Sequence, residues 1–250
     1  TSLSSESDYL SRNYNLSGTV ESESKNTVFN YGIAYSDDLI HPKFGKRGTK
    51  NVIDAIAGIT QVLTKQDIAQ VNLRYSVGNG YFSDPYKLFD ERPNHRDQKS
   101  LSLRWNHFFE ETEGTTKINY RYYNDSWGIK SHTISSEYIQ PISDGWVVSP
   151  LLRFYSQTNV SFYIPVDPNS DGPTQPPLEA RYYSLDQRLS AFGALTYGLK
   201  VSKWISKDWL VDFKIEKYEQ RSGWAIWGNK DSKLDSFDAQ SLQFGITKYF

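Results

Sequence analysis

The chain contains 250 residues, with a formal net charge of −1 and a mean hydropathy of −0.63. The balanced charge gives no indication of nucleic-acid binding, and no apolar run approaches the roughly 18 residues of a membrane-spanning helix. These properties exclude a helical membrane protein. They do not exclude a transmembrane β-barrel, in which only alternate residues of each strand need to be apolar.

The residue composition narrows the class further. Aromatic residues make up 15% of the chain, including 18 Tyr and 7 Trp, which fits the two aromatic girdles of a membrane barrel. There is no Cys, so disulfides, thiol catalysis and cysteine-ligated metals are excluded. There is also no Met, and no signal peptide is visible, so we expect a processed chain or a portion of a longer one.

Apolar and polar residues alternate with period two along most of the chain, which predicts strands and not helices. In residues 68–77, for example, Leu73 and Tyr75 oppose Asn72 and Arg74. Strands with the same character are expected near residues 14–20, 101–109, 115–123, 195–202, 209–218 and 241–250. About eleven strands are expected in one antiparallel up-and-down barrel.

The connections between these strands alternate in length. Short ones are expected near residues 22–26, 64–67, 110–115, 143–145 and 206–208, and long ones near residues 37–50, 79–99, 159–186 and 223–237. A shorter link at residues 124–131 belongs with the long set by its order. Outer-membrane barrels alternate short periplasmic turns with longer external loops in this way.

One face of nearly every expected strand carries charge. A soluble sandwich could present such a face to water, and a barrel could turn it toward a wet lumen. In the barrel, the interior is either closed by salt bridges, open to solutes with a basic excess that favours anions, or a seat for a protein partner. The expected lumen-lining residues are Arg74, Arg104, Lys117, Arg121, Glu137, Arg153, Asp212, Lys214 and Glu216.

Tryptophans flank many of the expected connections. Indole rings suit the boundary between membrane and water, because they are apolar with one polar atom. We therefore expect Trp127, Trp146, Trp204 and Trp209 to be membrane-interface anchors. In the link at Trp127, Asn124 and Asp125 suit turn hydrogen bonds, and Gly128 suits a positive φ.

Residues 241–250 form an apolar strand that ends on an aromatic residue. They resemble the C-terminal recognition strand of Gram-negative outer-membrane barrels, which assembly machinery reads, with Phe244, Ile246 and Phe250 as the expected signal. Lys248 departs from that pattern, although a lysine at the membrane rim can extend to headgroups. Counted backwards from this strand, the first strand also runs toward the periplasm. Bacterial single-chain barrels have an even number of strands, so we expect residues 1–250 to be one barrel domain whose N-terminal strands are missing.

No residue pattern indicates catalysis. The four histidines have no metal-ligand spacing, and phosphate-loop, nucleophile-elbow and HExxH motifs are absent. Asp167, Asn169 and Asp171 imitate the start of a calcium loop, but the closing acid falls one residue late, at Glu179. A turn-rich external loop is the favoured interpretation. We expect no cofactor and no enzymatic activity.

Several stretches resemble a bacterial outer-membrane family known as a domain of unknown function (family 3570). Residues 122–133, YYNDSWGIKSHT, look like that family's recurrent FSDTWGIRAHT. Residues 153–157, RFYSQ, followed by Phe162 and Tyr163, are similar to its RYYSQ…FY run, and QVLTK at 61–65 and GYFSDPY at 80–86 also match in order. The matches span residues 7 to about 163. The resemblance implies a barrel with further N-terminal strands and no established activity. Members are often encoded near thioredoxin-like and flavin-transferase proteins, which implies a redox or envelope-assembly context.

The sequence therefore predicts a protein of the bacterial outer membrane that acts as a channel or transport component with a charged, polar lumen. The first alternative is a structural barrel that holds a periplasmic, lipoprotein or redox partner. The second is a soluble secreted β protein. The expected partners are outer-membrane lipid and the barrel-assembly machinery, and nucleic acid is not among them.

Overall fold

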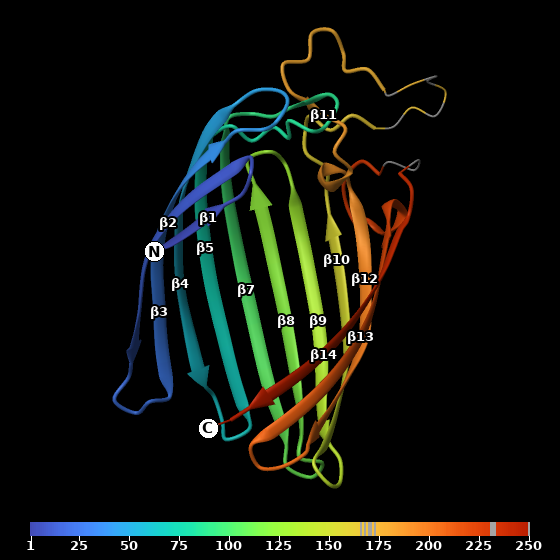
Figure 1. Ribbon diagram of the computed structural model, residues 1–250. Helices are drawn as coiled ribbons and strands as arrows, with labels where there is room; N and C mark the ends of the chain where they lie inside the picture. Colours follow the sequence, from blue (N-terminus) through green and yellow to red (C-terminus); the bar gives the residue numbers. More distant parts are fainter. Residues whose placement is uncertain (166, 168, 170–171, 173, 231–233, 250) are drawn as a thin grey trace.

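The computed structural model describes residues 1–165, 167, 169, 172, 174–230 and 234–249. Twelve strands form one sheet in which each strand lies beside its neighbour in the chain (Figure 1). Every pairing is antiparallel, so the predicted up-and-down arrangement is confirmed. The strands are β1 (Ser2–Ser5), β2 (Tyr9–Glu21), β3 (Thr27–Ile40), β4 (Gly48–Val62), β5 (Asp67–Gly80), β7 (His95–Phe109), β8 (Gly114–Asp125), β9 (Lys130–Pro141), β10 (Trp146–Gln157), β12 (Phe192–Trp204), β13 (Trp209–Arg221) and β14 (Phe237–Lys248).

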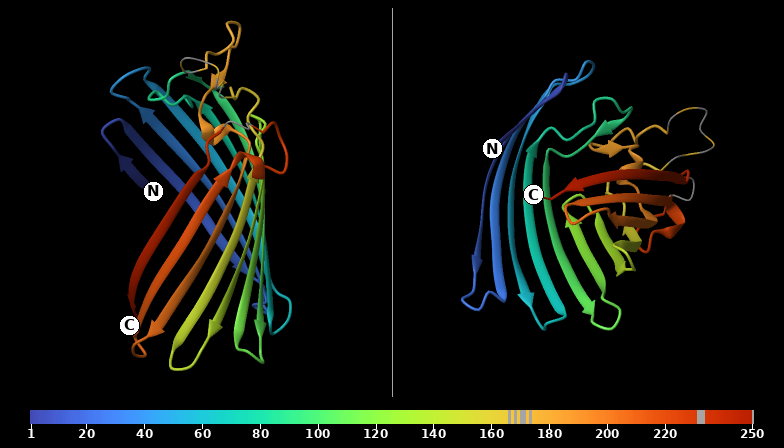
Figure 2. Two further views of the ribbon diagram at one scale, coloured as in Figure 1. Left: turned by 90° about the vertical axis from the view of Figure 1, so that its right-hand side faces the viewer. Right: turned by 60° about the horizontal axis from the view of Figure 1, so that its bottom comes forward.

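Eleven of these strands are long, and they account for the strands expected from the sequence. Each contains 12 to 15 residues, whereas β1 contains 4. At about 3.3 Å per residue, a tilted strand of this length crosses the hydrocarbon core of a bilayer. Figure 2 shows the strands tilted and the sheet curled. The described part of the chain has no helix long and apolar enough to cross a membrane.

Short and long connections alternate, as predicted. The short turns, such as residues 22–26, 110–113 and 142–145, all lie at the lower end in Figure 1. Lys25, Glu113, Asp144 and Gly145 adopt the positive φ that tight turns require. The longer connections lie at the opposite end. They include a second, two-stranded sheet of β6 (Asp90–Glu91) and β11 (Tyr183–Ser184), and the short 3-10 helices η1 (Gln187–Leu189) and η2 (Ser222–Trp224).

The outer wall of the curled sheet is apolar and exposed. Leu73, Leu152 and Phe244 expose 58%, 53% and 68% of their surface, and they share this wall with many other large apolar residues. The side chains of successive strand residues point to opposite faces, so the polar residues between them line the inner wall. A water-soluble protein buries its apolar face. The reversed pattern here suits a barrel with lipid outside and water inside.

The described strands curl without closing. Among the residues that the structure describes, β1 and β14 are the two edges of the large sheet and do not pair with each other. Figure 2 shows the resulting opening between the first and last strands. In lipid, each unpaired peptide group at such an edge costs several kcal/mol, about as much as other unsatisfied polar groups.

The two walls can be distinguished by placing one charge on each. We expect Leu73→Arg, near the middle of β5, to destabilise the folded barrel by about 2–4 kcal/mol, because it places a guanidinium in the bilayer core. Asn72→Arg changes the neighbouring residue, which lies on the inner wall, and should destabilise the barrel far less, because water hydrates the new guanidinium there even though it lies near other arginines. Urea unfolding in phospholipid vesicles measures both. Equal destabilisation by the two variants would contradict the assignment of the walls.

Candidate solute pathway and its external cap

A row of polar side chains crosses the inner wall at mid-height. Its members face one another in register from strand to strand, so they all point to the same side of the sheet. We call Gln70, Arg104, Asn119, Ser135, Arg153, Thr196 and Tyr218 the middle row. The next row toward the external loops contains Asn72, Ser102, Arg121, Thr133 and Tyr155.

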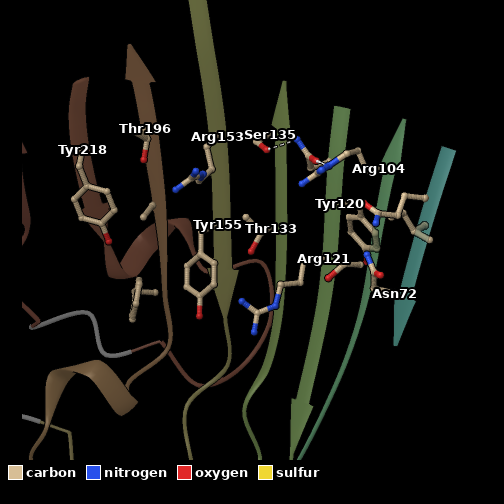
Figure 3. A pocket seen from close by; sticks show the side chains of 16 residues that line it. Asn72, Arg104, Tyr120, Arg121, Thr133, Ser135, Arg153, Tyr155, Thr196 and Tyr218 are labelled. Carbon is tan, nitrogen blue, oxygen red and sulfur yellow. Dashed lines mark hydrogen bonds between the residues drawn. The ribbon is translucent and has the colours of Figure 1, made fainter. Parts of the chain in front are cut away.

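The two rows line a hollow of about 710 Å³ on the inner wall (Figure 3). Arg104, Arg121 and Arg153, which we call the arginine triad, line it together with Tyr155 and Tyr218. All three arginines are exposed. Sequence reasoning identified the arginines but did not single out Tyr155 or Thr196. Tyr155 is two residues after Arg153, so alternation puts both on one face of β10. Thr196 is the register partner of Arg153 and lies on the polar face of β12. Alternation within each strand therefore contains the signal for both residues.

The arginine triad has no acidic partner among the residues that the structure describes. Arg104 donates from Nε to Asn119 Oδ1 at 2.9 Å, and the guanidinium of Arg121 lies 5.6 Å from the ring centre of Tyr123. Arg153 makes no ion pair with any residue that the structure describes. Three positive charges therefore face the hollow without neutralisation.

The other six predicted lumen residues lie on the same inner wall, but each has an ion-pair partner. Arg74 Nε lies 2.7 Å from Asp54 Oδ1, Lys117 Nζ lies 3.9 Å from Glu137 Oε2, and Lys214 Nζ lies 3.0 Å from Glu216 Oε1. Asp212 pairs with Lys200 at 3.6 Å. The inner wall thus contains neutralised pairs and, separately, the unpaired arginine triad.

The predicted role of Trp127 as a membrane anchor is wrong. Trp127 is only 3% exposed and lies in a buried cluster with Ile129, Val160 and Leu189 in the external loops. Phe82 and Phe162 each pack edge-on against its ring at 5.4 Å. Its Nε1 donates to the His95 carbonyl at 2.8 Å, so the polar atom is satisfied inside the protein.

The turn that presents Trp127 forms as its sequence predicts. The Asp125 carboxylate accepts hydrogen bonds from the backbone N–H groups of Trp127 and Ile129 at 3.0 and 2.9 Å. Gly128 adopts φ of 104°, which strongly favours glycine. Arg96 donates to Asp125 and lies 4.2 Å from the ring centre of Trp127, so one cation stabilises both.

A second cluster joins two long loops that are distant in sequence. Asp186, with a side chain 1% exposed, lies between Arg92 Nη2 at 2.9 Å and Arg188 Nη2 at 2.6 Å, with Lys87 Nζ at 3.6 Å. Arg92 also pairs with Asp90, which accepts a hydrogen bond from Ser184. Because β6 pairs with β11 at the same place, we call this cluster and the Trp127 cluster together the external cap.

Two of the remaining tryptophans lie on the outer wall beside the short turns. Trp146 and Trp209 are 45% and 42% exposed, and Lys203 and Lys248 lie over their rings. Trp204 is different, because the register of β12 puts it on the inner side, where its ring lies 5.3 Å from that of Tyr249. The structure therefore does not support an anchor role for Trp204.

Phe244 and Ile246 lie on the outer wall of β14 and are 68% and 58% exposed. Their role as an assembly signal stays a prediction, and Phe250 lies outside the described residues.

Asp171, in the calcium-like stretch, also lies outside the described residues. Asp167 Oδ1 accepts from the Asn169 N–H at 3.0 Å, which is a turn hydrogen bond. The described residues contain no group of three His, Asp or Glu able to hold a metal ion.

The cap should loosen in acid. Burial raises the pKa of Asp186, but hydrogen bonds from Arg188 and the charges of Arg188 and Lys87 outweigh burial and hold the pKa at about 2. A lowered folded-state pKa stabilises the cap above the ordinary pKa of about 3.9, and this stabilisation is lost as the pH falls from about 4 to about 2. Asp186→Asn should produce faster amide exchange at residues 81–94, 158–165 and 174–191 already at pH 7. Asp208→Asn, in a short turn, is the control and should leave those loops unchanged.

Lipid contact of the tryptophans can be measured directly. In variants that retain one tryptophan each, brominated lipid should quench Trp209 strongly and Trp127 hardly at all, because Trp127 is enclosed by protein. Trp146 should behave like Trp209. Strong quenching of Trp127 would contradict the external cap.

The fold is shared with solved outer-membrane proteins at low sequence identity. CdiB from Escherichia coli aligns with a TM-score of 0.56 and 14% identity over 97% of this chain and 48% of that chain. The ferric citrate transporter FecA in its unliganded form aligns with a TM-score of 0.56 and 12% identity, over 96% and 41% of the two chains. CdiB from Acinetobacter baumannii gives 0.51 and 13%, over 97% and 45%. The chain thus spans less than half the length of each of these proteins.

No curated protein matches this sequence. The apolar outer wall and the shared fold identify a protein of the bacterial outer membrane. The sequence model of one family matches residues 1–48 and 43–241, which together include nearly all of the chain. The chain therefore belongs to the family described as Protein of unknown function (DUF3570).

Proposed function

We propose that this protein is a non-enzymatic channel or transport component of the outer membrane, with a polar lumen along the inner wall. The observation that carries the proposal is the hollow of about 710 Å³, where three arginines stay exposed and without acidic partners among the described residues. A wall that serves only to stiffen the barrel gains nothing from unpaired like charges, because they repel one another. Charge exposed to a lumen sets which solutes pass.

The outer wall supports the same proposal. Its exposed apolar side chains suit lipid, and the inner wall offers hydroxyl, amide and charged groups to water. One structural neighbour is a ferric citrate transporter, so this fold is compatible with solute transport. The similarity to that neighbour, at 12% identity, supports the fold alone.

We also infer that further strands complete the wall in the intact protein. Among the described residues, the edges β1 and β14 leave backbone groups unpaired, which lipid does not tolerate. Lipid and the barrel-assembly machinery are the expected partners, with the exposed apolar residues of β14 as the surface to be recognised.

Conductance tests the proposal. The intact protein, purified in detergent and inserted into planar bilayers, should produce stable ion-conducting steps, and a salt gradient should give a reversal potential of the sign for anion preference. Intact barrels without conductance would contradict the channel. Co-purification with a stoichiometric partner whose segment fills the lumen would instead identify a structural barrel that holds a periplasmic or lipoprotein partner.

A further inference from the structure

We propose that the arginine triad, together with Tyr155 and Tyr218, forms a binding seat for an anionic sugar, a hydroxyl-rich solute that carries a carboxylate or phosphate group. This inference deepens the proposed transport function by naming the class of solute.

The charge pattern of the inner wall is the first argument. Ion pairs on this wall neutralise, among others, Arg74, Lys117, Lys200 and Lys214. The arginine triad departs from that pattern, although Glu137 lies on the same wall close by, paired with Lys117. Arginine stays protonated at all physiological pH values. The missing negative charge is therefore supplied from solution, and an anion in the hollow is the species that supplies it.

The placement of the three arginines is the second argument. Arg104 and Arg153 belong to the same row but to β7 and β10, with β8 and β9 between them. At about 4.8 Å per strand, their backbones are roughly 14 Å apart. Arg121 lies one row higher on β8, between them. Long arginine side chains from three strands of one wall can reach an acidic group that lies between them, and each guanidinium can bind a carboxylate or phosphate through two parallel hydrogen bonds.

The tyrosines supply the third argument. The Tyr155 hydroxyl donates to Gln157 at 2.5 Å and the Tyr218 hydroxyl donates to Gln220 at 2.8 Å. These bonds hold the phenol groups in place while both rings line the hollow (Figure 3). Arg121 and Tyr155 lie in the same row, with one strand between theirs. An aromatic face beside a guanidinium suits a molecule with an apolar ring face and an acidic group.

Small polar groups complete the lining. Thr133, Ser135 and Thr196 offer hydroxyl groups around the arginines (Figure 3). Asn119 adds an amide group to the same lining. Such groups hydrogen-bond either as donor or as acceptor, as sugar hydroxyls do. A simple anion such as chloride would use the arginines and leave this lining without a role. An anionic sugar uses the cations, the rings and the hydroxyl groups together.

Calorimetry on the intact protein in detergent tests the seat. The probes are glucuronate, glucose 6-phosphate, neutral glucose and chloride at constant ionic strength. We expect binding of at least one anionic sugar, at least tenfold tighter than that of glucose and of chloride. Binding of only one anionic sugar identifies the acidic group that the arginines recognise. Equal binding of glucose, or no binding of either anionic sugar, would overturn the proposal.

Matched variants locate the binding. Arg121→Gln should weaken the anionic sugar about tenfold, and R104Q/R121Q/R153Q should abolish binding. Lys117→Gln removes the same charge from the same face of the same strand, but from an existing ion pair, and should change affinity less than twofold. A heat-dependent mobility shift confirms that each variant is folded. If Arg121→Gln binds as the unchanged protein does, or Lys117→Gln loses as much affinity, the seat is wrong.

The binding seat and the channel function can be tested independently of each other. Binding of the anionic sugar without any conductance keeps the seat and rejects the channel. Conductance without binding of an anionic sugar keeps the channel and rejects the seat.

Discussion

Lipid offers no hydrogen-bond partner to a peptide group, and the rest of this structure depends on that constraint. A strand can cross a bilayer only if its neighbours satisfy every N–H and C=O group. The long antiparallel strands do so through continuous ladders, in which consecutive residues of one strand pair with consecutive residues of the next. Between the two edge strands the backbone is satisfied within the sheet, so the side chains on each wall are free to match their solvent. Apolar residues therefore accumulate on the outside, and polar residues on the inside.

The inner wall is organised by charge as well as polarity. Toward the short turns, pairs such as Lys117–Glu137 and Lys200–Asp212 neutralise one another across adjacent strands. At mid-height the wall changes character, and the arginine triad stands without acids among the described residues. In a partly hydrated interior, cross-strand pairs of opposite charge stabilise the sheet modestly. Unpaired cations on one wall do the opposite, and this is the reason why we propose a role in solute binding for them.

Period-two alternation in the sequence predicts the strands and the side of the sheet for each of the nine expected lumen-lining residues. The ladder registers put all nine predicted residues on one wall. Alternation also predicts the side of Trp204, because extending the pattern of β12 to its last residue places that side chain on the inner wall. Proximity to a short turn suggested the opposite. The ion pairs were less accessible, because they depend on the register that each turn sets between two strands.

Trp127 shows where local reasoning ends. A tryptophan beside a tight external turn has the same local sequence whether it faces lipid or a folded loop. Its partners Phe82 and Phe162 come from two other connections, and nothing in residues 122–133 specifies them. Likewise, Arg92 and Asp186 are 94 residues apart, so no motif could show that they meet. Contacts between loops follow from the completed sheet and not from the pattern within a strand.

The external cap has a mechanical consequence for the sheet beneath it. The loop after β5 and the loop after β10 meet through β6 and β11, and so they connect strands that are several places apart along the curve of the wall. Such a connection runs along the chord of an arc. It opposes both flattening and tightening of the arc, in addition to the strand-to-strand ladder. The stretch from β5 to β12 is therefore braced against a change of curvature at this rim, and groups in the loops contribute to the shape of the basic hollow.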